Sequence, residues 1–238
     1  MQSDDKTLRE CWGVKMNYLF VVAHPDDEVL GAGATIPKLI LEGHKVAVAI
    51  MCGQADARKN LSPSLMQDEA EAMKIMGVEK VYHSNFPNIK MNTVPHLELV
   101  QYIEGCIKDW SAEAIFTHHP SDTNNDHVMT SFAAQAASRL FQRREGLPRL
   151  KKFIYMEVPS STEWSFDSSS NRFSPNMFVE VGLNGVDLKL KALAAYKGVM
   201  HPYPHPRSNE AIRGLAAHRG VQAGCNYAEA FECVFFRT

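Results

Sequence analysis

Long apolar runs and an excess of charge are both missing from this sequence, and each absence excludes a class of protein. No stretch reaches the length that a membrane-spanning helix requires, so we expect no membrane span. The 25 lysine and arginine residues nearly balance the 27 acidic residues, which leaves a formal net charge of −2. A surface this close to neutral gives no electrostatic basis for binding nucleic acid, and we expect no such partner.

Cysteine is sparse, and no Cys-x-x-Cys pair occurs. The five cysteines lie far apart in the chain, at Cys11, Cys52, Cys106, Cys225 and Cys233. Residues 1–6 are polar and lack the apolar core of a signal peptide. Because an odd, scattered set of cysteines without a secretory signal favours reduced thiols, we expect a cytoplasmic protein.

Short apolar segments alternate with longer amphipathic segments along the chain, and no repeat or linker divides it. The predicted strands cover residues 17–23, 45–51, 81–83, 113–117, 152–158, 178–181 and 229–236. The predicted helices cover residues 29–42, 62–76, 93–109, 128–143, 186–198 and 208–219. This alternation indicates an α/β fold with a mainly parallel sheet and helices on both faces. A single domain spanning 1–238 is long enough to bury a full core.

A cluster of acids follows the first predicted strand, in Ala-His-Pro-Asp-Asp-Glu at residues 23–28. Open α/β sheets bind ligands at the carboxyl ends of their strands. Two interpretations are open here. In the first, Asp27 and Glu28 only favour the start of a helix, where the macrodipole attracts acids, and His24 is a loop residue. In the second, His24 and Asp27 bind one divalent metal, and Asp26 lies beside the metal as a proton acceptor.

A second polar loop, residues 118–127, follows the fourth predicted strand and holds three histidines, two aspartates and two asparagines. Part of this loop suits a turn, and Asp126 could cap the helix that follows. Local turn chemistry does not explain why this loop, like the first motif, lies at the carboxyl end of a strand. Those ends share one edge of a doubly wound sheet, so the two loops are expected to meet there.

Two histidines and one carboxylate form a catalytic ligand set for zinc, because they leave a fourth position open. We assign this set to His24, Asp27 and His127. Zinc lowers the pKa of a bound water to about 7, and Asp26 can accept the proton of that water. Asp126, next to His127, is a candidate for orienting a metal ligand or the base.

Together, the motif at 23–28 and His-Pro-x-Asp-x-x-x-Asp-His at 119–127 resemble those of the PIG-L/LmbE family of zinc-dependent N-deacetylases. Pro-Arg-Ser at 206–208 and Tyr-Ala-Glu-Ala-Phe at 227–231 extend the resemblance towards the end of the chain. The resemblance implies a Rossmann-like three-layer sandwich. It also implies a hydrolase that removes acetyl from an N-acetylated amino sugar or amino-sugar conjugate and releases acetate and a free amine.

The same resemblance implies that His24, Asp27 and His127 hold Zn²⁺ or another divalent metal, with Asp26 as the general base. Arg58 matches a loop arginine of the family that faces the substrate. The expected partner is a small amino-sugar substrate, and the chain is expected to form a homo-oligomer.

One position departs from the family pattern. Many members have a histidine three residues before the last metal ligand, where this sequence has Asn124. Asparagine can donate a hydrogen bond to an oxyanion but cannot protonate the leaving amine. We therefore expect another histidine to supply that proton, either His205 or His201 of the proline-rich segment 200–207, or His119.

The proline-rich segment cannot be helical and is predicted to bring His205 and Arg207 to the substrate, with a rigid surface loop as the alternative. Trp164 is expected to pack, or else to stack on a sugar ring. Two other functions stay open. One is an amidase that acts on a larger amide of an amino-sugar conjugate. The other is a weakly active, metal-containing sugar-binding protein, which Asn124 would suggest.

Overall fold

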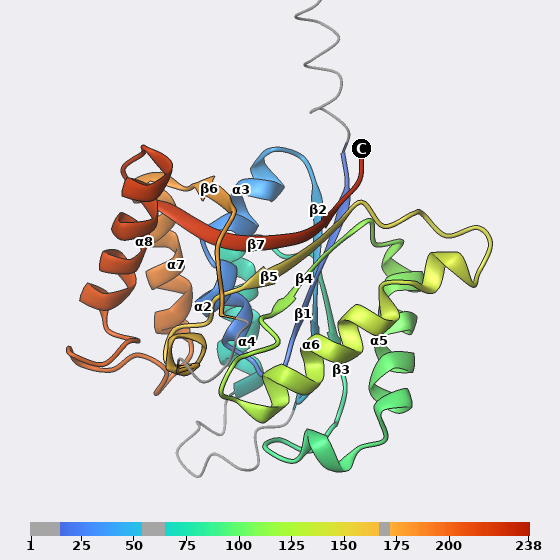
Figure 1. Cartoon of the computed structure of the whole chain (residues 1–238). Coiled ribbons are helices and arrows are strands. Elements are labelled where there is room, and N and C mark those ends of the chain that lie inside the picture. The colour runs from blue at the N-terminus through green and yellow to red at the C-terminus, as the bar shows by residue number, and fades with distance from the viewer. Residues whose placement is uncertain (1–14, 54–64, 167–171) are drawn as a thin grey trace, which may run out of the picture.

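One seven-stranded sheet organises the protein, whose computed structural model describes residues 15–53, 65–166 and 172–238 (Figure 1). The strands are β1 (Asn17–Val22), β2 (Lys45–Ile50), β3 (Lys80–His83), β4 (Ala114–His118), β5 (Lys152–Met156), β6 (Met177–Glu180) and β7 (Ala228–Phe236). They lie in the order β3-β2-β1-β4-β5-β7-β6. The first five strands pair in parallel, whereas β7 is antiparallel to both β5 and β6. The prediction of a mainly parallel sheet is therefore confirmed.

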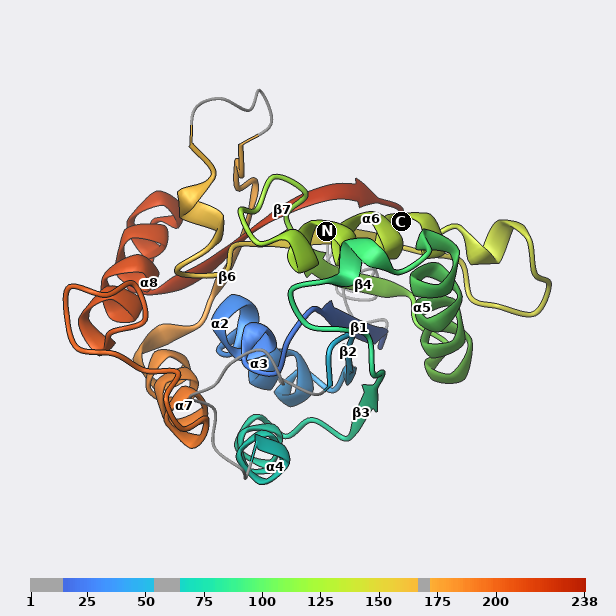
Figure 2. The ribbon, with the colours of Figure 1, turned by 90° about the horizontal axis from the view of Figure 1, so that it is seen from below.

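Helices cover both faces of this sheet, as the alternation of strands and helices predicted (Figure 2). One face carries α2 (Asp27–Ala32), α3 (Thr35–Leu41), α4 (Leu65–Met76), α7 (Gly182–Ala195) and α8 (Asn209–Ala223). The other face carries α5 (His96–Trp110) and α6 (Asn125–Ala137). Three short 3₁₀ turns lie at Met91–Thr93, Leu140–Gln142 and Thr162–Trp164. The three-layer sandwich is confirmed.

The apolar runs form strands because both faces of the sheet are buried. Alternate residues of β1 face opposite ways, so Phe20 packs into the core under α2–α4 and α7–α8, and Leu19 packs into the core under α5 and α6. Both side chains are fully buried. A strand buried on both sides reads as a continuous apolar run. None of the helices in the described ranges is both long and apolar enough to cross a membrane.

The predicted helix 29–42 is wrong, because the structure has two helices there with a break at Gly33. A Cβ at Gly33 would lie 2.6 Å from the carbonyl oxygen of Val29, so only glycine fits this bend. Charged groups from the other end of the chain stabilise the break. Glu229 accepts from the backbone N–H of Thr35 at 2.7 Å, and Lys189 Nζ donates to the Leu30 carbonyl at 2.7 Å.

Helix α6 begins at Asn125, three residues earlier than the predicted start at 128, and ends at Ala137 rather than 143. The Asn124 side chain caps it by accepting from the backbone N–H of Asp126 at 2.9 Å. Asp126 is therefore not the cap that the turn interpretation allowed. Since Asp126 and His127 lie in the first helical turn, their backbone positions are fixed by the helix.

The first motif and the second loop meet at the point where the sheet changes winding direction. β1 has β2 on one side and β4 on the other, and the helices that follow β1 and β4 cover opposite faces. A crevice opens at the carboxyl ends of two such strands. The fold thereby places residues 23–28 beside residues 118–127.

The buried ion pair between Lys189 and Glu229 generates a stability prediction. Both residues are 6% exposed, and their charged atoms lie 2.7 Å apart. Lys189→Met should lower the free energy of unfolding by about 3–5 kcal/mol, because it leaves the Glu229 charge buried without its partner. Chemical denaturation measures the loss.

The matched control is Arg213→Met, which breaks an exposed pair with Asp187. Its effect should stay within about 1 kcal/mol, since exposed ion pairs contribute little. Equal losses in the two variants would contradict the role of burial at the helix break.

Candidate metal centre

Three predicted metal ligands converge between β1 and β4. Asp27 Oδ2 lies 3.3 Å from His24 Nδ1 and 3.2 Å from His127 Nε2. All three residues are at most 2% exposed. His24 lies in the turn that follows β1, Asp27 begins α2, and His127 lies in the first turn of α6. Residues about a hundred positions apart are thus brought within contact distance, as the paired motifs predicted.

Three donor atoms of this cluster are buried without a well-formed hydrogen bond. Within the described ranges these atoms are His24 Nδ1, Asp27 Oδ1 and His127 Nε2, and the two nitrogens face the charged Asp27 Oδ2. Such atoms are rare because each costs about 1–3 kcal/mol of desolvation. Two imidazole nitrogens and a carboxylate oxygen are also the donors that a catalytic metal site uses. The residues therefore fit a divalent metal.

A carboxylate holds the second nitrogen of each imidazole. His24 Nε2 lies 3.0 Å from Asp126 Oδ2, and His127 Nδ1 lies 3.1 Å from Asp122 Oδ2. Carboxylates in these places orient metal-binding histidines and raise their basicity. Asp126 thus lies beside a predicted metal ligand, where the sequence placed it as a candidate for orienting that ligand. Sequence reasoning missed Asp122, which it assigned to a turn.

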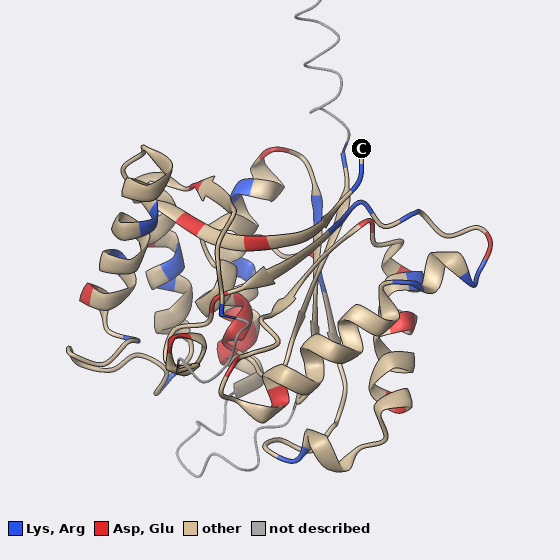
Figure 3. Ribbon diagram, in the orientation of Figure 1, with Lys and Arg blue, Asp and Glu red and all other residues tan. Residues whose placement is uncertain are grey.

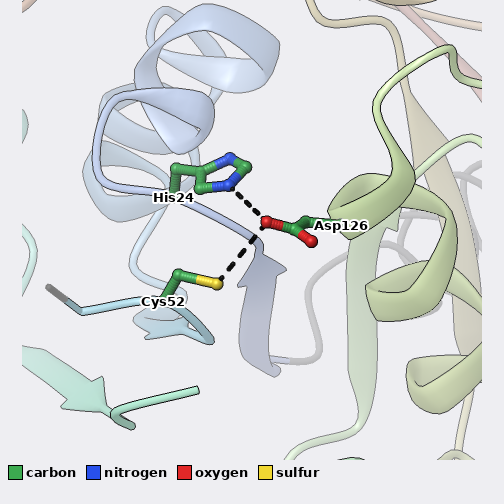
Figure 4. Close-up of side chains that lie close together, drawn as sticks. All are labelled: His24, Cys52 and Asp126. Carbon is green, nitrogen blue, oxygen red and sulfur yellow. Dashed lines mark hydrogen bonds and ion pairs between the residues drawn. The ribbon is translucent and has the colours of Figure 1, made fainter. Parts of the chain in front are cut away.

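Asp126 connects His24 to two further segments, and Figure 4 shows one of these contacts, with Cys52. It accepts from the backbone N–H of Ile89 at 2.5 Å and of Met91 at 3.1 Å, and the Cys52 thiol lies 3.9 Å from its Oδ2. His24, Cys52 and Asp126 are close enough to be considered as another ligand set. In this set, Asp126 already hydrogen-bonds to His24 and Cys52. We therefore prefer His24, Asp27 and His127 as the ligand set, because donor atoms in that set are unpartnered among the described residues.

His118 is a histidine of the site that the sequence analysis did not assign to any role. Its ring stacks on His127 with centroids 3.9 Å apart, and its Nε2 accepts from the backbone N–H of Ala23 at 2.8 Å. Complete burial and the neighbouring His127 lower its pKa to about 3. His118 is therefore a neutral packing partner. Its sequence position at the end of a strand could not separate this role from metal binding.

Burial opposes charge on both predicted histidine ligands, but the carboxylates outweigh it. Asp27 and Asp122 raise the pKa of His127 to about 9, and the neighbouring carboxylates of Asp126 and Asp27 raise the pKa of His24. The same histidines lower the pKa of Asp27 far below its ordinary value, although burial acts the other way. Without a metal, protonated imidazoles compensate the negative charge of the carboxylates in the cluster.

Asp26, the predicted base, has an unusual backbone. Its φ of 107° lies in the left-handed region, which non-glycine residues rarely adopt, and it is fully buried. Its Oδ2 accepts from Arg207 Nη1 at 3.3 Å. Arg207 Nε also donates to Ser160 Oγ at 2.6 Å. Arg207 was predicted to bind substrate, and its described contacts place it against Asp26. Figure 3 shows the acids at the start of α2 inside the molecule.

The other candidate histidines lie in two different places. His119 is buried, and its ring contacts Tyr155 and Phe173 while its Nε2 lies 3.3 Å from Glu232. It therefore belongs to the side of the sheet near β7. His205 lies in the proline-rich segment next to Arg207, whose backbone N–H it accepts at 3.0 Å.

The ring of His201 lies 4.3 Å from that of His205. His205 lies two residues before Arg207, whose side chain contacts Asp26. Arg58, predicted to face the substrate, lies outside the described residues, as does the predicted helix start at 62–64.

Asn88 is a polar residue that sequence reasoning missed altogether. It is 8% exposed, yet neither its Oδ1 nor its Nδ2 has a hydrogen-bond partner in the described ranges. The next residue, Ile89, has a φ of 60°, a strained conformation for a β-branched side chain. Strain and unpartnered polar atoms together are typical of functional loops. Only Pro-Asn in a loop at the carboxyl end of a strand could have drawn attention to it.

Comparison with known proteins agrees with this geometry. The family model PIG-L, GlcNAc-PI de-N-acetylase, matches residues 19–138, just over half of the chain and both motifs up to His127. The uncharacterized deacetylase YaiS of Escherichia coli (strain K12) is 26% identical over 201 residues, which cover 81% of this chain and 97% of YaiS.

Two solved structures share the fold at lower identity. N,N'-diacetylchitobiose deacetylase from Pyrococcus horikoshii, solved with its inhibitor MPG, superposes with a TM-score of 0.72 at 21% identity, covering 98% of this chain and 94% of that one. GalB, the 4-carboxy-2-hydroxymuconate hydratase from Pseudomonas putida KT2440, gives a TM-score of 0.74 at 21% identity, covering 94% and 98%. The fold is thus common to proteins with different reactions.

The protonated histidines generate a prediction about metal binding. A metal that binds His127 Nε2 must displace the proton that the imidazole holds below a pKa of about 9. The affinity for Co²⁺, a coloured probe, should therefore rise by about tenfold per pH unit for each proton released between pH 6.5 and 8.5. Absorbance titration of the metal-free protein measures it.

Asp122→Asn is the matched variant, because it removes the carboxylate that holds His127 Nδ1. It should weaken binding by about 10–100-fold and flatten the pH dependence. An affinity for Co²⁺ that does not change across this pH range would contradict the proposed ligand set.

Proposed function

This chain belongs to the PIG-L family, and from that premise we propose that it is a zinc-dependent N-deacetylase. Its substrate would be an N-acetylated amino sugar or amino-sugar conjugate, and its products acetate and a free amine. One observation carries the proposal: His24 Nδ1 and His127 Nε2, which make no well-formed hydrogen bond to any described residue, converge in the crevice on the Asp27 carboxylate. Each imidazole is held on its other nitrogen by a buried carboxylate.

His24, Asp27 and His127 would hold the zinc ion, and Asp126 and Asp122 would keep the two imidazoles in the right tautomer and orientation. When bound, zinc supplies Lewis acidity for the amide carbonyl and for the attacking water. The ligand set leaves room for both, since three protein donors do not complete its coordination. Zinc itself is proposed because nitrogen and oxygen donors in this number suit it.

Asp26 would take the proton from the attacking water. Its carboxylate is fully buried next to a metal-ligand residue, and Arg207 donates to its Oδ2. Since the leaving amine must gain a proton, Asp26 can return the same proton to the nitrogen. The other acid that the sequence suggests, His205, His201 or His119, remains the alternative to this shuttle. His205 would contact the substrate at the edge of the site.

Asn124 would face the oxyanion with its amide nitrogen. Its Oδ1 is occupied by the cap hydrogen bond of α6, so only Nδ2 can donate to a ligand. One such donor typically contributes about 10²–10³-fold to the rate of acyl transfer. The capping bond and the oxyanion contact are compatible, because they use different atoms of one amide.

Substrate recognition would involve Asn88 and residues at the mouth of the crevice. The unpartnered amide of Asn88 offers one acceptor and two donors, which suit the hydroxyl groups of a sugar. Trp164 is 52% exposed and could stack on a ring of the substrate. Arg58 stays a proposed substrate contact.

We also propose a cytoplasmic location and a homo-oligomer. The four cysteines in the described ranges are all free thiols, as a reducing compartment requires. Exposed Phe132 on α6 and exposed Val234 and Phe235 on β7 line one surface and offer apolar area to another copy. The single-domain boundary 1–238 remains part of the same proposal.

The direct test is turnover of a panel of N-acetylated amino sugars by the zinc-loaded protein. Acetate and primary amine should appear in equal amounts, and chelation of the metal should abolish both. Asp26→Asn should lower kcat by about 10²–10⁴-fold, because the proton acceptor is lost. Asp187→Asn, on the surface of α7, is the control and should retain full turnover.

A larger carboxylic acid released in place of acetate would identify an amidase of bigger conjugates. Metal-loaded protein that binds these sugars without hydrolysing any of them would favour a sugar-binding protein and overturn the deacetylase assignment.

A second prediction concerns Asn88. Asn88→Leu should raise the free energy of unfolding by about 1–3 kcal/mol, because it removes two unpartnered buried polar atoms. It should also raise KM by about tenfold through lost contacts with the sugar. Asn92→Leu, on an asparagine that accepts from Asn125 in an exposed pair, is the control. A loss of stability in Asn88→Leu would show that Asn88 has a structural partner instead.

A further inference from the structure

Asp26 occupies the N-cap position of α2 but does not act as a cap. Aspartate is among the best N-cap residues, because its carboxylate can accept the free backbone N–H groups of the first turn. Here the Asp26 side chain makes no cap hydrogen bond. Its φ of 107° lies in the left-handed region, and its Oδ2 accepts from Arg207 instead. A residue in this conformation relaxes unless its surroundings hold it.

The backbone N–H of Asp26 is held by Glu28. Oε2 of Glu28 accepts it at 3.2 Å, which directs that carboxyl group back along the helix axis. On its other side, Oε1 of Glu28 accepts from the Tyr196 hydroxyl at 2.7 Å. Glu28 is fully buried and Tyr196 is 1% exposed, so water does not compete for either bond. Tyr196 comes from the end of α7, far along the chain.

We infer that Glu28 and Tyr196 are positioning residues that keep the Asp26 carboxylate facing the site instead of capping α2. This inference rests on the proposed role of Asp26 as the proton acceptor. The relay has three parts: Tyr196 fixes the rotamer of Glu28, Glu28 fixes the backbone N–H of Asp26, and the backbone fixes the direction of the Asp26 side chain. Neither Glu28 nor Tyr196 is a ligand of the metal in the set described above.

Among the described residues, Arg207 and Glu28 restrain different parts of Asp26. Arg207 donates to the carboxylate, and Glu28 accepts from the backbone N–H. Loss of the Arg207 contact alone leaves the left-handed backbone in place. Loss of the Glu28 contact lets the backbone return to a common conformation, in which the carboxylate can accept from the first turn of α2. The base is then turned out of the site while the chain stays folded.

The first experiment compares Tyr196→Phe and Glu28→Met with the zinc-loaded wild-type enzyme. Each should lower kcat by about tenfold or more, with KM within about twofold and the zinc content unchanged. Glu28→Gln should recover most of the kcat that Glu28→Met loses. Its amide oxygen can accept the Asp26 N–H while its amide nitrogen donates to the Tyr196 hydroxyl.

Tyr82→Phe is the matched control, because it also deletes a tyrosine hydroxyl that donates to a carboxylate, Asp109, at 2.6 Å. Tyr82 lies on β3 and Asp109 on α5, away from the crevice. The Tyr82→Phe variant should therefore have an unchanged kcat. Equal losses in Tyr82→Phe and Tyr196→Phe would overturn the inference.

A double-mutant cycle tests whether Tyr196 acts through Asp26. In the Asp26→Ala background, Tyr196→Phe should cause no further loss of the residual activity. An equal fold-loss in both backgrounds would overturn the inference, since Tyr196 would then act by another route. A crystal structure of Glu28→Met gives a readout independent of turnover. Asp26 should have a negative φ and its carboxylate should cap α2, whereas an unchanged Asp26 overturns the inference.

The same variants separate this inference from the proposed function. If Asp26→Ala keeps wild-type turnover, the role of Asp26 as the base fails, and the positioning role fails with it. If Asp26→Ala is inactive while Tyr196→Phe and Glu28→Met are fully active, only the positioning role fails.

Discussion

The buried carboxylate of Asp27, between the imidazoles of His24 and His127, is the constraint on which the rest of the site depends. A charge removed from water must be compensated by partners with good geometry. Each partner is in turn held by another group, Asp126 on one imidazole and Asp122 on the other. Both supports come from the segment 118–127, and other segments hold them in turn, since Asp126 accepts from Ile89 and Met91 and Asp122 accepts from Thr162. The carboxyl edge of the sheet is fixed because several segments must satisfy one cluster.

Much of the fold follows from local patterns, because strands buried on both faces must be apolar and parallel strands need helical connections. The break between α2 and α3 and the antiparallel direction of β7 do not follow from such patterns. The break depends on Lys189 and Glu229, which are more than 140 positions away from Gly33 and whose approach only the tertiary fold decides.

The candidate metal ligands were predictable from their chemistry and from the topology of the sheet. Acids and histidines at two strand ends indicated His24, Asp27 and His127, since those ends had to share an edge. The roles of His118 and Asp122 were not predictable, because they depend on which ring nitrogen faces which neighbour. The contact between Arg207 and Asp26 likewise needs the proline-rich segment to fold back, which no local rule describes.

The fold alone does not choose between reactions, since a deacetylase and a hydratase both superpose on this chain. Both kinds of enzyme have to activate water, but only amide hydrolysis must also give a proton to a leaving nitrogen. The deciding feature is therefore a group that can take a proton and release it over the bond being broken. We propose that in this chain that group is Asp26. Its left-handed backbone withdraws the carboxylate from helix capping, and a residue used in this way loses a local stabilising bond in exchange for a catalytic position.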